Sequence, residues 1–223
     1  MNRQILNATK RELENQPDPK SKGEQEIDLD FITELGSIGA GHAATALSDM
    51  LQQPISIDVP KIRLMQAHLV PKFYNKHDAP TVAVYLQLTE RYGCDILLMI
   101  ELEEAKKIAA IMTFASSIEE LDPTMETSAI NELANILIGS FLTAISDFIE
   151  MTILPTTPQS IVDTFDSILD SFLIKQSMVS ENAMVFETRF KRQGEDAKCM
   201  LMVFPSQELN ELLTQKSKTL IKA

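Results

Sequence analysis

From residue 123 onward, apolar residues recur every three or four positions, which is the spacing of one buried face of an α-helix. The apolar positions are Ile130, Leu133, Leu137, Phe141, Ala144 and Phe148. Asp122 followed by Pro123 supplies a side-chain N-cap and a proline at the first helical position. The pattern therefore predicts a long amphipathic helix from Pro123 to about Glu150.

The same pattern occurs earlier in the chain. Residues 30–60, DFITELGSIGAGHAATALSDMLQQPISIDVP, align without a gap on residues 128–158, SAINELANILIGSFLTAISDFIEMTILPTTP. The matched pairs are Glu34 and Glu132, Leu35 and Leu133, Ile38 and Ile136, Gly41 and Gly139, Ser48-Asp49 and Ser146-Asp147, and Pro60 and Pro158. Such self-similarity indicates a duplicated unit. It predicts two halves, about 27–115 and 122–220, and a first long helix from Asp30 to about Gln52.

The remaining apolar runs are strand-like, and the short, hairpin-like links between the later runs favour antiparallel pairing. We therefore expect an α+β domain over residues 27–223 with a mainly antiparallel central sheet. Residues 1–26 are polar and charged and read as a flexible extension. Strands are expected at 55–63, 81–89, 95–102, 160–162, 173–179, 183–192 and 198–204, and further helices at 103–114 and from 207 onward.

The glycines of the first copy admit a second interpretation. Gly39-Ala40-Gly41-His42-Ala43-Ala44 matches the G-x-G-x-x-G/A spacing of a dinucleotide-binding turn, and Asp58 lies near the position of a ribose-binding carboxylate. The second copy opposes that interpretation, because it has no glycine at the positions of Gly36 and Gly39 and is plainly helical. The repeat favours a helix through the glycines, with the close approach of another backbone as their reason.

Composition excludes several classes of function. The formal net charge of −12 disfavours nucleic-acid binding, which requires clustered Lys and Arg. No stretch approaches the roughly 20 apolar residues of a membrane span. Cys94 and Cys199 both lie in apolar runs, so a reducing, cytoplasmic location is expected. The three histidines, His42, His68 and His77, lack metal-ligand spacing, so no metal site is expected.

Beside the apolar stripe of the second helix runs a line of polar or small residues: Ser128, Glu132, Asn135 and Gly139. Their spacing of 4, 3 and 4 places them on one face. The corresponding line in the first helix is Asp30, Glu34, Ser37 and Gly41. A single Glu-x-x-Asn pair is usually an ordinary solvated surface, but its repetition at matched positions favours a functional site.

The pattern Asp/Ser-x3-Glu-x2-Asn, followed by 22 residues and a proline, resembles the signature of the CheC, CheX and FliY family of chemotaxis phosphatases. Ser128, Glu132, Asn135 and Pro158 match it fully, whereas Asp30, Glu34, Ser37 and Pro60 match it except at the asparagine. Two copies in one chain resemble CheC. The resemblance implies a pseudo-twofold fold in which the halves share one sheet, with both motif helices on one face.

The resemblance also implies a reaction, hydrolysis of the aspartyl phosphate of the response regulator CheY. Asn135 would orient the attacking water and Glu132 would dock the regulator. Glu34 and Ser37 would form a weaker second site, because a hydroxyl lacks the separate donor and acceptor of an amide. The protein would need no cofactor of its own, since Mg²⁺ would be bound by the regulator. The alternative is a weakly catalytic or non-catalytic module that binds the regulator or CheD.

Overall fold

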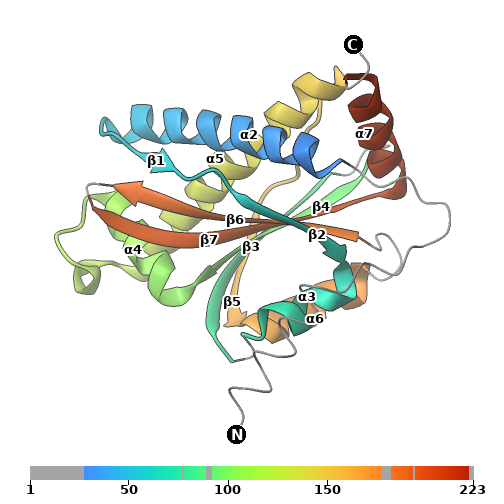
Figure 1. Cartoon of the computed structure of the whole chain (residues 1–223). Coiled ribbons are helices and arrows are strands. Elements are labelled where there is room, and N and C mark those ends of the chain that lie inside the picture. Colours follow the sequence, from blue (N-terminus) through green and yellow to red (C-terminus); the bar gives the residue numbers. More distant parts are fainter. Residues whose placement is uncertain (1–27, 77, 89–91, 177–181, 193, 221–223) are drawn as a thin grey trace, which may run out of the picture.

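The computed structural model describes residues 28–220 apart from 77, 89–91, 177–181 and 193. Its centre is one seven-stranded antiparallel sheet with the order β1-β6-β7-β4-β3-β5, in which β2 also pairs with β6 (Figure 1). The strands are β1 (Ser56–Ile57), β2 (Lys61–Gln66), β3 (Pro80–Leu88), β4 (Cys94–Glu101), β5 (Gln159–Thr164), β6 (Asn182–Arg192) and β7 (Glu195–Pro205). The expected α+β class and antiparallel pairing are confirmed.

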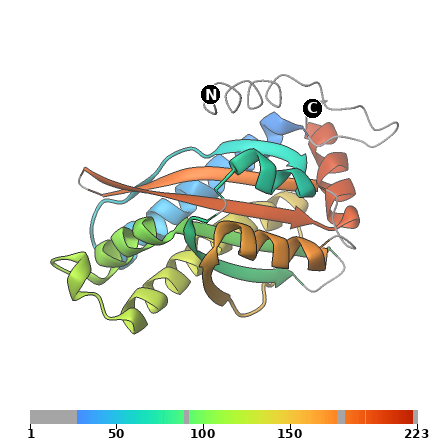
Figure 2. The same ribbon diagram turned by 90° about the horizontal axis from the view of Figure 1, so that it is seen from below.

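The helices form layers on both faces of the sheet. Helices α2 (Leu29–Leu51) and α5 (Pro123–Ile149), which we call the motif helices, lie side by side across one face (Figure 1). The short α3 (Val70–Tyr74) and α6 (Phe165–Gln176) lie on the opposite face, which we call the far face (Figures 1 and 2). The remaining elements are the helices α4 (Leu102–Thr113) and α7 (Gln207–Leu220) and the 3₁₀ turns η1 (Ala67–Leu69) and η2 (Ile118–Glu120).

Strand residues alternate between two hydrophobic cores. Ile96, Leu98 and Ile100 of β4 pack into the larger core with the motif helices, whereas Leu97 and Met99 face the far side. This alternation follows from the pleat, which directs successive side chains to opposite faces. Because both faces are covered, the middle strands read as continuous apolar runs.

The two halves exchange strands. After α2 the chain enters β2, which pairs with β6 of the second half, and after α5 it enters β5, which pairs with β3 of the first half. The central strands β4 and β7 then join the halves directly, with Leu98 opposite Leu201. Each half therefore completes the sheet of the other, as a pseudo-twofold duplication requires.

The motif helices begin and end in the same way. Asp28 accepts a hydrogen bond from the Asp30 backbone N–H at 2.9 Å, and Asp122 accepts one from that of Thr124 at 2.6 Å. These N-caps satisfy donors that the first helical turn leaves free. The backbone N–H of Thr124 lowers the pKa of the Asp122 carboxyl. Both helices end at left-handed residues, Gln52 and Glu150.

The serines aligned by the repeat stabilise the exits of these helices. The Ser48 hydroxyl accepts a hydrogen bond from the Ile55 backbone N–H at 3.0 Å, and Ser146 donates one to the Met151 carbonyl. Each serine thus ties the last turn to the segment that leads into the sheet. Ser48 and Ser146 are therefore matched for a structural reason.

The segment GSIGAGHAA is helical throughout, so the dinucleotide-turn interpretation is wrong. Gly39 allows the two motif helices to approach, because a Cβ there would lie 3.1 Å from the Cα of Phe141. At Gly36 a Cβ would lie 3.1 Å from the ring of Pro60. The expected close approach of another backbone is confirmed at Gly39.

Two expectations about local structure are wrong. Residues 173–176, expected to begin a strand, form the last turn of α6, whose Phe165, Ile168, Leu169 and Phe172 are buried at helical spacing. The rest of that expected strand, 177–179, lies outside the described residues. The single strand expected at 55–63 is instead two short strands, because Pro60 lies between them and cannot donate to the ladder.

Within the described part of the chain, only α5 has the length and mean hydropathy of a membrane span. The same helix contributes ten buried residues and packs between α2, α4 and the sheet. A core helix passes the same test of length and composition, so the apolar character of α5 is accounted for by this packing.

Candidate functional site

The spacing of the second motif places its side chains on the outer surface of α5. Ser128, Glu132 and Asn135 are exposed, whereas the neighbouring Leu133 and Ala134 are fully buried. Glu132 and Asn135 are one turn apart, so their side chains are neighbours. Neither side chain has a hydrogen-bond or ion-pair partner within the described residues. Both are therefore free to contact a partner molecule.

The surface beyond Asn135 is flat. Gly139 follows one turn later, and a Cβ built on it would meet no atom within 4 Å. Gly41 of the first motif has the same open surroundings. Packing inside the protein therefore does not require these two glycines, unlike Gly36 and Gly39. What they provide is an unobstructed helix surface.

The first motif is arranged similarly on α2 but differs at its third position. Asp30 and Glu34 are exposed, and Ser37 is half-buried. The Ser37 hydroxyl donates its proton to the Thr33 carbonyl at 2.8 Å. Serine hydroxyls in helices commonly bond to the carbonyl four residues earlier. Ser37 therefore presents to solvent an oxygen that can accept but whose proton is already used.

The two prolines of the motifs, Pro60 and Pro158, have a structural role. Pro60 is buried, and its ring lies against α2 at Gly36, directly below the first motif. Pro158 is half-buried and immediately precedes β5. Neither ring carries a donor or acceptor that could act on a ligand. These prolines support the helices and the start of the strands.

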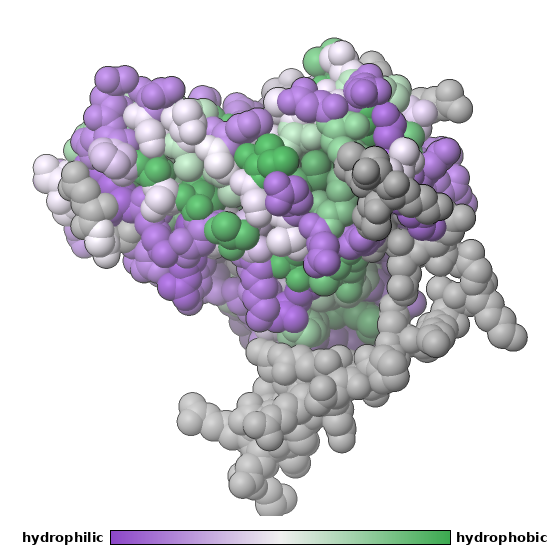
Figure 3. All heavy atoms as spheres, turned by 45° about the horizontal axis from the view of Figure 1, so that its top comes forward, coloured by the Kyte–Doolittle hydropathy of each residue, from purple (hydrophilic) through white to green (hydrophobic). Residues whose placement is uncertain are grey.

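Both motifs lie on the same side of the molecule. The motif helices run antiparallel, since Phe31 near the start of α2 packs against Phe148 near the end of α5, with ring centroids 4.3 Å apart and ring planes inclined by 48°. Figure 3, which looks obliquely onto this side, shows hydrophilic residues interspersed with hydrophobic ones. Ile38, beside Ser37, is 39% exposed, so an exposed apolar side chain lies next to the polar residues of the first motif. Such a mixed surface is typical of transient protein contacts.

His42 is exposed on α2 one residue beyond Gly41. Among the described residues, no three His, Cys, Asp or Glu side chains gather as metal ligands would. The side chains of the two motifs themselves are carboxylates, hydroxyls and the carboxamide of Asn135.

Comparison with known proteins agrees with this architecture. The model of the CheC-like family matches residues 27–63 and 125–162, one segment around each motif helix. "CheY-P phosphatase CheC" of Bacillus subtilis is 29% identical over 196 residues, which cover 86% of this chain and 94% of that protein. The chain is thus similar to the CheC-like family in both copies of its repeat.

The chain is also similar to FliY in sequence and structure, and to the FliM middle domain in fold alone. "Flagellar motor switch phosphatase FliY" of B. subtilis is 30% identical over 145 residues, and the match spans only 37% of that longer protein. The crystal structure of Thermotoga maritima FliY matches with a TM-score of 0.67 at 25% identity, covering 85% of this chain and 95% of that one. The FliM middle domain from H. pylori shares the fold, with a TM-score of 0.60 at 11% identity.

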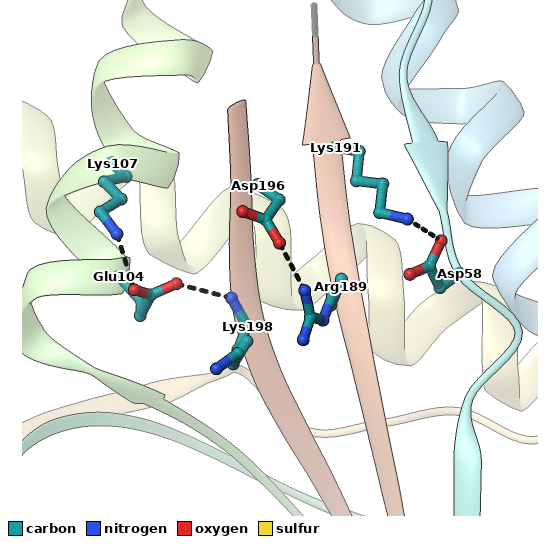
Figure 4. Close-up of polar contacts among 7 residues, drawn as sticks. All are labelled: Asp58, Glu104, Lys107, Arg189, Lys191, Asp196 and Lys198. Carbon is teal, nitrogen blue, oxygen red and sulfur yellow. Dashed lines mark hydrogen bonds and ion pairs between the residues drawn. The ribbon is translucent and has the colours of Figure 1, made fainter. Parts of the chain in front are cut away.

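Sequence reasoning missed a second group of polar residues, located on the far face. Figure 4 shows ion pairs between Lys191 and Asp58, Arg189 and Asp196, and Lys107 and Glu104. The signal in the sequence was the run Glu187, Arg189, Lys191, in which every second residue of an apolar strand is charged.

Proposed function

We propose that this protein hydrolyses the aspartyl phosphate of a CheY-type response regulator, with the α5 motif as its main active site. The observation that supports this most directly is the exposed, unpartnered pair Glu132 and Asn135 on a helix surface left open by Gly139. The proposal also draws on the names of two relatives, which are phosphatases of CheY-P or of the flagellar switch.

Asn135 is proposed to hold the attacking water. Hydrolysis of an acyl phosphate requires a water in line with the phosphorus and the leaving carboxylate oxygen. The Asn135 carboxamide has an oxygen that can accept a proton from that water and an NH₂ group that can donate to a phosphoryl oxygen. The side chain thereby positions the nucleophile without acting as a base, which is the usual protein contribution to phosphoryl transfer.

Glu132 is proposed to fix the angle at which the regulator docks. Its carboxylate lies one turn before Asn135 and is free to accept a charge-assisted hydrogen bond from a cationic side chain of the partner. Mg²⁺ is expected to be bound by the regulator and to offset the charge of the phosphoryl oxygens there. This protein's share of the reaction is then orientation of the water and of the partner.

The α2 motif is proposed to bind the regulator with little catalysis. Glu34 is exposed as Glu132 is, so the docking contact is retained. The Ser37 proton is held by the Thr33 carbonyl, and the shorter side chain cannot reach as far as an asparagine. For the α2 site taken alone, this bonding also favours the second candidate function. That function is a module that binds the regulator or CheD without turnover.

The test is phosphate release from CheY-P mixed with the purified protein. Asn135→Ala is expected to lower the rate constant about 100-fold, or roughly 3 kcal/mol of transition-state stabilisation, with regulator binding retained. Glu132→Ala is expected to weaken binding more. Decay of CheY-P at its spontaneous rate in the presence of saturating protein would contradict the proposal.

A further inference from the structure

A cavity of about 610 Å³ lies on the far face of the sheet, away from both motifs. Its apolar wall includes Met99 of β4, Met200 of β7 and Phe165 of α6. Charged residues of β6, β7, α4 and the segment around β2 surround this wall. The volume lies within the range of sites for small organic ligands.

The cavity exists because the two halves cover the far face unequally. Helix α6 has 12 residues, and its Phe172 packs on Tyr85 of β3 with ring centroids 5.6 Å apart. Helix α3 has only five residues and ends at Tyr74, whose hydroxyl donates to Glu187 of β6 at 2.8 Å. In Figure 2 neither helix covers the parts of β6 and β7 nearest to α4. Arg189 and Lys198 are exposed there.

Every carboxylate that lines the cavity already has a cationic partner. The pairs are Asp58 with Lys191 at 2.6 Å, Glu101 with Lys76 at 2.6 Å, Glu104 with Lys107 at 2.7 Å, and Glu187 with Arg63 at 3.2 Å. Glu104 also accepts the backbone N–H of Lys198 at 2.8 Å. Burial opposes the shift, but the hydrogen bonds from Lys107 and the Lys198 backbone, and then the charges of Lys107 and Lys198, lower the pKa of Glu104. Each carboxylate of the cavity is thus held by its own cation, and only Glu104 also acts on the charge of Lys198.

Two lysines of the cavity form no ion pair of this kind among the described residues. Within the described residues the ammonium groups of Lys61 and Lys198 form no ion pair or hydrogen bond. Lys198 stands directly opposite Arg189 in the β6–β7 ladder. Like charges at directly opposed positions destabilise a sheet. The Arg189 guanidinium is held by Asp196 at 2.8 Å, whereas the Lys198 ammonium has no contact with the other residues in Figure 4.

We propose that this cavity binds a small multivalent organic anion, of the carboxylate or phosphate class, between Lys198, Lys61 and Arg189. An anion placed there removes the repulsion between the opposed cations and pairs the two free ammonium groups. The apolar wall of methionine and phenylalanine suits the carbon skeleton of such a ligand. A chain with a net charge of −12 repels anions in general, so binding depends on this local arrangement.

The test uses citrate and inorganic phosphate as separate probes, with NaCl at matched ionic strength as the reference. Backbone amide shifts of the full chain report binding, and the amides of Arg189 and Lys198 are expected to shift saturably with at least one probe. Lys198→Gln is expected to weaken that binding about tenfold or more. Lys216→Gln is the matched control, because Lys216 pairs with Glu150 on the other side of the sheet.

Thermal unfolding provides the second readout. Without added anion, Lys198→Gln is expected to unfold at no lower temperature than the wild type, since it removes the opposed charge. The binding anion is expected to raise the midpoint of the wild type and of Lys216→Gln but not of Lys198→Gln. Saturable binding of citrate alone assigns the ligand to the carboxylate class, and saturable binding of phosphate alone assigns it to the phosphate class. Equal responses in wild type and Lys198→Gln, or none beyond NaCl, would overturn the proposal.

Discussion

Gly39 of α2 lies against Phe141 of α5 so closely that a Cβ on Gly39 would be 3.1 Å from the Phe141 Cα. The contacting atom belongs to the backbone of a packed helix, so relief requires the two motif helices to move apart. Gly39→Ala is expected to destabilise the fold by about 1 kcal/mol net, because overpacking outweighs the gain in helix propensity. Urea unfolding measures this, and an unchanged or higher midpoint would show that the helices separate freely.

Gly139→Ala is expected to raise the stability of the fold and to lower the phosphatase activity. A Cβ there meets nothing within 4 Å, so the substitution should stabilise the helix by up to about 1 kcal/mol. If the regulator docks over Gly139, the same methyl group lowers phosphatase activity. Gly41→Ala is the matched control, since its surroundings are equally open and it belongs to the weaker site. Equal activity in both variants would place the docking surface elsewhere.

Ser37→Asn is expected to increase the activity of the α2 site severalfold, because that site contributes little to the wild-type rate. The substitution removes the bond to the Thr33 carbonyl and supplies the carboxamide present at Asn135. The decisive comparison is made in the Asn135→Ala background, where any recovered rate comes from α2. Ser37→Ala in the wild type serves as the control and should change the rate little. Absence of recovery would show that α2 does not present the regulator to residue 37.

Alkaline pH is expected to destabilise the protein. Burial, followed by the charge of Glu187, raises the pKa of Tyr74 far above 10.0, its value when solvated. The folded state therefore keeps a proton that the unfolded state releases, so stability is intact below about pH 10 and falls as pH rises further. Unfolding midpoints measured at about pH 8 and pH 10.5 should differ, and less so in Tyr74→Phe. The same slope in the variant would remove Tyr74 as the cause.

The two thiols are expected to be unreactive in the folded protein. Burial raises the pKa of Cys199 to about 12 and also raises that of Cys94. The thiolate is the reacting species, so both steric access and ionisation oppose modification. A chromogenic disulfide reagent at about pH 8 should react only at the rate of unfolding and should then modify both thiols. Rapid reaction before unfolding would contradict their burial.

The sequence predicted the elements whose pattern spans many residues. The motif helices, expected at 30–52 and 123–150, are Leu29–Leu51 and Pro123–Ile149, because caps and apolar spacing agree there. Helix α6 was missed because its last residues were assigned to a strand expected at 173–179 and its first residues were assigned to no element. Helix α3 is only five residues long and has too few turns to show a period.

The candidate site could be predicted only in part. Spacing places Glu132 and Asn135 together on the surface, and the structure shows both exposed. Spacing could not show that Ser37 bonds to Thr33, since a hydroxyl rotor is fixed by local geometry. Nor could it bring Lys61 and Lys198 to one cavity, because strand pairing across the halves sets that neighbourhood.

The exchange of β2 and β5 between the halves bears on how such a chain can arise. A separate single-motif half would leave its own β3 or β6 without the outer strand that it has here. Two such halves could complete the sheet only by associating, at a concentration above their dissociation constant. Residues 115–122, which join the halves, turn that bimolecular step into an intramolecular one with an effective concentration of about millimolar order. Once the halves are joined, one motif can lack the asparagine and still keep its helix, because the other motif helix packs against it.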